Sequence, residues 1–138
     1  MTREAVIVST ARTPIGKAYR GAFNDTDAPT MGGHAVSSAV ARAGIEPSEV
    51  DDVIMGCVTP FGEQGGNIAK AALQYADWDY DVPGMQINRF CASGLESVNL
   101  SAMKIRSGWQ NLIVAGGIEC MSRVPMGSDG GSIALEPK

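Results

Sequence analysis

The sequence predicts an α/β fold built on a mostly parallel β-sheet with βαβ crossovers, and three observations lead to this prediction. Apolar runs of strand length alternate along the chain with helical patterns, the order typical of parallel sheets with right-handed crossovers. The apolar runs are continuous, as in strands that are covered on both faces. Many of the 17 glycines fall between these runs, where tight turns are expected.

The first predicted strand is the apolar run 5–9, AVIVS, which suits burial on both faces. A loop punctuated by glycine and proline follows it as far as Asp27. We expect Asp27 to cap the next helix, with Pro29 in its first turn, because Asp accepts hydrogen bonds from the free N–H groups of a helix start. Apolar residues then recur at helical spacing until Gly44, which closes the helix.

The rest of the chain continues this alternation. We predict a strand at 52–58, a helix at 67–75, a short strand at 85–87, a helix from about 92 to 107 and a strand at 110–117. Sites in parallel sheets form at the carboxyl ends of the strands. The loops after Val58 and Val114 are therefore expected to converge with the loop that carries Cys91. No regular element is predicted after Met121.

Composition limits the classes of function. The 138 residues suffice for one domain with a core, and 44% hydrophobic with 19% charged residues are typical of a soluble globular protein. A net charge of −4 and a pI near 4.9 argue against a nucleic-acid or anionic-membrane partner. No run approaches the ~18 apolar residues of a membrane span. The first residues lack the pattern of a signal peptide, and three widely spaced cysteines suggest neither a disulfide framework nor a metal site, so we expect a cytoplasmic location.

The helix that follows Cys91 has an unusual composition. It carries the small residues Ser93, Gly94, Ser97 and Ser101, apolar residues around its circumference, and one acid before its last turn. A surface helix has one apolar stripe and one charged face. We therefore predict that this helix is largely buried and that Gly94 has close backbone neighbours, so that a large residue would be poorly tolerated there.

Cys91 is predicted to lie at the amino end of this helix, near its unpaired N–H groups. A helix amino terminus stabilises a negative charge by about 0.3–1 kcal/mol, or ~2 kcal/mol when partly buried. That is too little to ionise most of a thiol at neutral pH, so a nucleophilic Cys91 needs a base or a cationic partner. The alternative is a buried structural thiol, and the local sequence leaves both interpretations open.

Other candidate residues have simpler interpretations. His34 is the single histidine and lies on the first helix, where we expect a structural or exposed side chain and no base for Cys91. Cys57 and Cys120 follow strands and are predicted to be buried thiols. The loop FGEQGGN lacks the Lys-Ser/Thr pair of a phosphate-binding P-loop, so a turn is favoured. A small basic cluster in the first loop is predicted to be a solvated or interface surface, with phosphate contact as the alternative. Its members are Arg12, Lys17 and Arg20.

The segment NRFCASGLES, which contains Cys91, resembles the acylated-cysteine motif of the thiolase family. Three supporting segments lie in the family's order: VIVSTARTPIGK, VTPFGEQGGNIAKAAL and AGGIECMSRVP. The resemblance covers essentially the whole chain and implies a thiolase N-terminal half with a buried catalytic-cysteine helix. Residues 1–121 would form the α/β domain, and residues 122–138 would begin the loop domain that is inserted in it. The Arg-Phe-Cys-Ala sequence resembles the corresponding segment of degradative and broad-range 3-ketoacyl-CoA thiolases more than that of biosynthetic acetoacetyl-CoA enzymes.

The resemblance implies a ping-pong acyl transfer between coenzyme A thioesters, the activity of an acetyl-CoA C-acyltransferase or acetyltransferase. Cys91 would attack an acyl-CoA and hold the acyl group as a thioester, with its backbone N–H as a possible oxyanion donor. Coenzyme A or acetyl-CoA would then enter, for 3-ketoacyl-CoA thiolysis or acetoacetyl-CoA formation. Coenzyme A and acyl-CoA are thus expected as substrates, with no permanently bound cofactor and no metal.

Thiolases also need an activating histidine, a second cysteine and a water held by asparagine. His34, Cys57 and Cys120 do not match these motifs, and most of the coenzyme A loop is also missing. The resemblance therefore implies two kinds of partner, a complementary C-terminal half and further copies in a homo-oligomer, either a dimer or a tetramer. The alternative is a non-catalytic thiolase-like module that only binds or assembles with a partner. A companion chain with Gly-His-Pro and Cys-x-Gly motifs would favour the enzyme.

Overall fold

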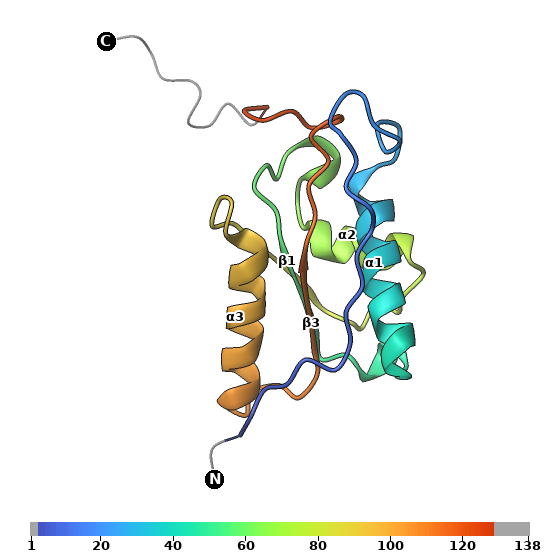
Figure 1. The fold of residues 1–138 in the computed structure, drawn as a ribbon. Helices are drawn as coiled ribbons and strands as arrows, with labels where there is room; N and C mark the ends of the chain where they lie inside the picture. Colours follow the sequence, from blue (N-terminus) through green and yellow to red (C-terminus); the bar gives the residue numbers. More distant parts are fainter. Residues whose placement is uncertain (1–2, 129–138) are drawn as a thin grey trace, which may run out of the picture.

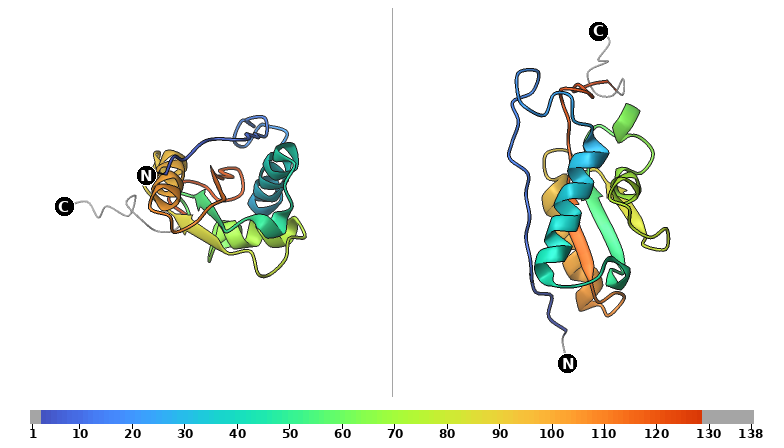
Figure 2. Two further views of the ribbon diagram at one scale, coloured as in Figure 1. Left: turned by 90° about the horizontal axis from the view of Figure 1, so that it is seen from below. Right: turned by 90° about the vertical axis from the view of Figure 1, so that its right-hand side faces the viewer.

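The computed structural model describes residues 3–128, and it shows a three-stranded parallel sheet between helices (Figure 1). The strand order is β2-β1-β3, with both pairs parallel, which confirms the predicted α/β class. Helix α3 covers one face of the sheet, and α1 and α2 cover the other (Figures 1 and 2). The elements are α1 Ala28–Ala43, β1 Asp52–Gly56, α2 Ile68–Tyr75, β2 Gly84–Ile87, α3 Ser93–Arg106 and β3 Ile113–Gly117, with short 3-10 turns at Pro47–Glu49 and Gly62–Gln64.

The predicted ends of α1 are confirmed. The Asp27 carboxylate accepts hydrogen bonds from the backbone N–H of Thr30 at 2.8 Å and from its hydroxyl at 2.9 Å. Pro29 occupies the first turn, where a missing N–H costs nothing. Gly44 ends the helix in the left-handed conformation, with φ of +69°.

The central strand β1 is buried along its whole length, because it has a strand on each side and helices on both faces. Val53 and Ile54 are fully buried, as are Ile68 and Leu73 of α2. The continuous apolar run in the sequence therefore marks a strand covered on both faces. Most of the core lies between the sheet and helices α1 and α2.

Helix α3 packs against β1 and β3 through small residues. Ser93, Ser97 and Ser101 form its buried face, and the Ser97 hydroxyl lies 2.8 Å from the Gly116 carbonyl oxygen of β3. A Cβ atom added to Gly56 of β1 would lie 2.4 Å from the carbonyl carbon of Ser93. The close approach of backbones predicted for this helix is therefore present, and Gly56 makes it possible.

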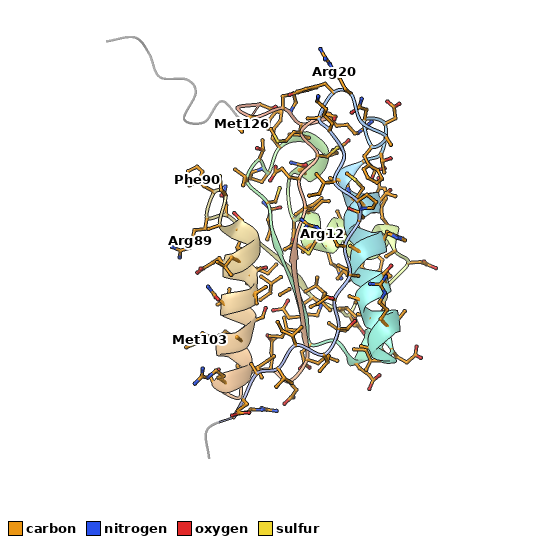
Figure 3. The ribbon with its side chains drawn as sticks, in the orientation of Figure 1. Arg12, Arg20, Arg89, Phe90, Met103 and Met126 are labelled. Carbon is orange, nitrogen blue, oxygen red and sulfur yellow. The ribbon has the colours of Figure 1, made fainter. Side chains whose placement is uncertain are left out.

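The prediction that α3 is largely buried is wrong for its outer face. Leu95 is 65% exposed and Met103 is 62% exposed, and Figure 3 shows Met103 pointing away from the sheet. A Cβ atom at Gly94 would meet no atom within 4 Å, so the predicted intolerance of this position to larger residues is also wrong. The physical reason is that the sheet covers only one side of the helix.

The predicted first strand is also wrong. The run 5–9 is extended but forms no ladder, and Val6, Ile7 and Val8 are each about 70% exposed. The segment runs past the β3 edge of the sheet and stands apart from it in the second view of Figure 2. The side chain of Arg42 donates to the carbonyl oxygen of Thr10 at 2.8 Å, but no described strand offers the backbone partners that a ladder needs.

After Met121, the described residues to Ser128 form only turns, as the sequence predicted. Residues 129–138 lie outside the described part of the chain. The boundary between a domain 1–121 and a loop domain starting at 122 therefore stays a prediction.

Candidate functional site

The carboxyl ends of the three strands are tied together by side chains. The Glu119 carboxylate follows β3 and accepts hydrogen bonds from the backbone N–H groups of Val58 at 2.8 Å and Thr59 at 3.1 Å, after β1. Asn88 follows β2, and its side-chain amide donates to the Val58 carbonyl oxygen at 2.9 Å. The predicted convergence of the three loops is confirmed.

The glycine-rich loop adds a buried amide to this cluster. Gln64 is fully buried, and its Nε2 donates to Glu119 Oε1 at 3.0 Å and to the Thr59 carbonyl oxygen at 2.9 Å. Its Oε1 accepts from the backbone N–H of Cys120 at 2.5 Å. The loop is thus a turn that places one polar side chain between two strand ends, in agreement with the interpretation from its sequence.

Cys91 lies in a strained connection between β2 and α3. Phe90 has φ of +48°, in the left-handed region that residues with a Cβ atom rarely adopt. The Asn88 Oδ1 atom accepts from the Phe90 N–H at 2.9 Å. The Ser93 hydroxyl accepts from the Arg89 N–H at 2.8 Å and donates to the Phe90 carbonyl oxygen at 2.6 Å. Figure 3 shows Arg89 and Phe90 on the side of the molecule that α3 covers, near the start of the helix.

Among the three cysteines, only Cys91 is exposed. Cys57 and Cys120 are buried, as predicted. Burial, with the nearby Glu119 carboxylate, raises the pKa of the Cys57 thiol to about 12. Cys57 is therefore a protonated structural thiol at neutral pH, whereas the interpretation of Cys91 as a buried structural thiol is wrong.

Cys91 has no base within the described residues. Its sulfur makes no hydrogen bond to any residue between 3 and 128. His34, the single histidine of the chain, is exposed on α1, which lies on the opposite face of the sheet from α3 (Figure 1). The expectation that His34 does not serve Cys91 agrees with this placement.

A cavity of about 500 Å³ lies away from Cys91, between the first loop, α1 and the end of β3. It is the space between the sheet and the N-terminal segment that forms no strand. Arg12 and Lys17 line it, and both are exposed. Arg20 is also exposed, and Figure 3 labels it together with Arg12. The basic cluster is therefore exposed, which fits a solvated or an interface surface, and its role stays a prediction.

Residues 3–128 contain no group of three His, Cys, Asp or Glu side chains that could hold a metal ion. In the same part of the chain, no helix is long and apolar enough to cross a membrane.

Comparison with known proteins identifies the family. The protein-family model for the thiolase N-terminal domain matches residues 5–134 of this chain. The chain belongs to the thiolase family. The resemblance seen around Cys91 is thereby confirmed, and so is the prediction of a thiolase-like N-terminal fold.

Similar thiolases are much longer than this chain. The 3-ketoacyl-CoA thiolase of Bacillus subtilis is 44% identical over 124 residues, which is 90% of this chain and 32% of that protein. The acetyl-CoA acetyltransferase of Syntrophomonas wolfei is 38% identical, over 91% of this chain and 31% of its own length. The crystal structure of the Bacillus anthracis acetyl-CoA acetyltransferase matches with a TM-score of 0.82 and 35% identity, over 88% of this chain and 30% of that one. The chain thus spans about a third of the length of these thiolases.

Several polar residues at the carboxyl ends of the strands were not singled out from the sequence for a role there. Asn88 follows β2, Glu119 follows β3, and Gln64 lies in the glycine-rich loop. Ser93, which was named only as a small residue, begins α3. The available signal was the predicted convergence of strand ends, because polar side chains at such ends can meet. Which of them bond to one another depends on the register of the strands, and the sequence does not give that register.

Proposed function

We propose that this chain is the nucleophile-bearing N-terminal part of a thiolase-type acyltransferase, with Cys91 as the residue that carries the acyl group. One observation supports this assignment above all. In a chain of the thiolase family, Cys91 is the exposed cysteine, at the carboxyl end of a strand, whereas Cys57 and Cys120 are buried.

The chemistry is a transfer of an acyl group through the Cys91 thiol. In 3-ketoacyl-CoA thiolysis, Cys91 Sγ attacks the 3-keto carbon, the bond between C2 and C3 breaks, and acetyl-CoA leaves with the thiol proton on its C2. In acetoacetyl-CoA formation, Cys91 Sγ attacks the carbonyl carbon of acetyl-CoA, the bond to the coenzyme A sulfur breaks, and coenzyme A leaves with the thiol proton. We propose the backbone N–H of Cys91 as one donor to the oxyanion that develops.

In the second step of thiolysis, the coenzyme A sulfur attacks the acyl carbon, its bond to Cys91 Sγ breaks, and the thiol proton of coenzyme A returns to Cys91. In acetoacetyl-CoA formation, C2 of a second acetyl-CoA loses a proton and attacks the acyl carbon, and Cys91 Sγ leaves and takes up the proton. The substrates are coenzyme A thioesters, and no cofactor stays bound.

The proposed acyl transfer needs residues that the described part of this chain does not place near Cys91. A thiol needs a base to react efficiently at neutral pH, and the single histidine lies across the sheet. We therefore propose a complementary thiolase C-terminal half as a partner. The exposed face of α3, with Leu95 and Met103, is an apolar surface of the kind that such a partner would cover. A homo-oligomer, either a dimer or a tetramer, and a cytoplasmic location complete the proposal.

The acyl-carrier assignment is tested by mixing the chain with a thiolase C-terminal half and exposing the mixture briefly to acetyl-CoA, followed by peptide mass mapping of this chain. We expect one acetyl group on the peptide that contains Cys91, and none on this peptide in Cys91→Ser, which should retain the fold because the change is small. Cys120→Ser is the matched control and should still be labelled on Cys91. A label on Cys57 or Cys120, with Cys91 free, would contradict the assignment.

The need for a partner is tested by turnover. We expect the isolated chain to show no thiolytic turnover of acetoacetyl-CoA, and to gain it when mixed with a thiolase C-terminal half. Full turnover by residues 1–138 alone would overturn this part of the proposal. An intact mass of the purified protein establishes in the same experiment which residues are present.

A further inference from the structure

We propose that Asn88 and Ser93 are positioning residues for Cys91, which hold Phe90 in its left-handed conformation and so fix where the thiol lies. The inference rests on the proposed function only for the role of Cys91. The strained turn and its hydrogen bonds are properties of the described residues.

The first step is that neither the backbone preference of Phe90 nor the burial of its side chain favours this conformation. Its φ of +48° brings Cβ close to its own carbonyl group, and only glycine, asparagine and aspartate visit the region readily. The Phe90 side chain is 69% exposed, so burial of the ring does not compensate for the strain. A strained residue of this kind persists only where surrounding interactions hold it.

The second step is that polar side chains on both sides of Phe90 hold its backbone. Asn88 Oδ1 accepts from the Phe90 N–H at 2.9 Å, and the Ser93 hydroxyl donates to the Phe90 carbonyl oxygen at 2.6 Å. The same hydroxyl accepts from the Arg89 N–H at 2.8 Å. Ser93 is only 4% exposed, so water does not compete for these bonds.

The third step is that the turn is fixed to the sheet. Asn88 Nδ2 donates to the Val58 carbonyl oxygen at 2.9 Å, while the Val58 and Thr59 N–H groups bond to the Glu119 carboxylate. The bonds run from the end of β3 to the end of β1 and on to the end of β2, in the order in which the strands lie. The backbone before Cys91 is therefore fixed relative to all three strands.

The consequence concerns the thiol directly. Cys91 is the next residue after Phe90, so relaxation of Phe90 to a right-handed conformation would redirect the chain at Cys91. A displacement of about 1 Å at a reacting group can cost on the order of a hundredfold in rate. Asn88 and Ser93 touch no reacting atom in this arrangement and act through the backbone of Phe90.

The experiment compares glycine and alanine at position 90 when Asn88 is replaced. In Asn88→Ala, we expect amide hydrogen exchange at Arg89 and Ser93 to accelerate by about tenfold or more, because the strain is no longer opposed. Acetylation of Cys91 by acetyl-CoA, measured with the C-terminal half present, should slow by about tenfold in the same variant. Adding Phe90→Gly should restore both rates to within about twofold of the wild type, because glycine adopts the left-handed region without penalty. Adding Phe90→Ala, the matched control, should restore neither.

Equal behaviour of the glycine and alanine variants would overturn the inference, because Asn88 would then only connect β2 to β1. Unchanged exchange in Asn88→Ala would also overturn it. If Asn88→Ala does not fold, Ser93→Ala replaces it in the same comparison, with the same expected rescue by glycine alone. A wild-type chain that is never acetylated on Cys91 in the presence of the C-terminal half would refute the proposed function, while the exchange rates would still decide the inference.

Discussion

Replacing Gly56 with alanine tests the contact on which α3 rests. The added Cβ atom would lie 2.4 Å from the Ser93 carbonyl carbon, 2.7 Å from the Ser93 carbonyl oxygen and 2.7 Å from the Gly94 nitrogen. All three atoms belong to the backbone, so no side chain can rotate out of the way. The first turn of α3 must move away from β1 for the methyl group to fit.

The cost follows from what that movement disturbs. Overpacking of a well-packed core typically costs about 1–3 kcal/mol, and we expect a value near 3 kcal/mol because a helix turn must shift. The hydroxyl of Ser97, 2.8 Å from the Gly116 carbonyl oxygen, would lose part of its bond as well. At roughly 3 °C per kcal/mol for a chain of this size, the melting temperature should fall by about 10 °C.

Urea unfolding gives the measurement, because the midpoint shifts with stability while the slope reports the surface exposed on unfolding. Gly94→Ala is the matched control on the facing helix. No atom lies within 4 Å of a Cβ atom there, and Gly94 is the second residue of α3, so this variant should be at least as stable as the wild type. A Gly56→Ala midpoint equal to that of the wild type would refute the reasoning.

Two other predictions concern buried ionisable groups. The pKa of the Cys57 thiol is raised from 9.0 to about 12 in the folded state. The stability that this shift contributes is therefore present below pH 9 and is lost as the pH rises towards 12. Urea midpoints should fall across this range, and they should fall less steeply in Cys57→Ala. Lys104 Nζ lies 2.6 Å from Asp52 Oδ2 with both side chains largely buried, so Lys104→Met should cost about 3–5 kcal/mol by leaving the carboxylate unpaired. Glu96→Gln, at an exposed ion pair, should cost at most about 1 kcal/mol, and equal losses in the two variants would contradict this account.

The elements that the sequence predicted well are those with local signals. Asp27, Pro29 and Gly44 define α1, because capping and turn preferences depend on neighbours in the chain. The three strands of the sheet were predicted to within a few residues at each end, since buried parallel strands are continuous apolar runs. The thiolase motif around Cys91 was also visible without a structure, and the family match confirms it.

The features that were missed depend on contacts between distant residues. The run 5–9 has the composition of a buried strand, but a strand also needs a partner, which the sequence pattern does not supply. Small residues on α3 indicated close packing, but not that Gly56 of β1 provides the space. The bonds among Gln64, Glu119 and Asn88 depend on strand order and register, which periodicity does not determine.

The backbone of α3, the helix that follows Cys91, packs directly against the backbone of the sheet. Between Gly56 and Ser93 there is no layer of side chains that could absorb a displacement. Met55 of β1 is buried in the core, and its Cε atom lies 3.8 Å from the place that a Cβ atom on Gly32 of α1 would take. We expect a change in side-chain volume at Met55 that shifts β1 to move the start of α3 as well, because their backbones are in direct contact. Core residues on the far side of the sheet would then affect the position of the Cys91 thiol.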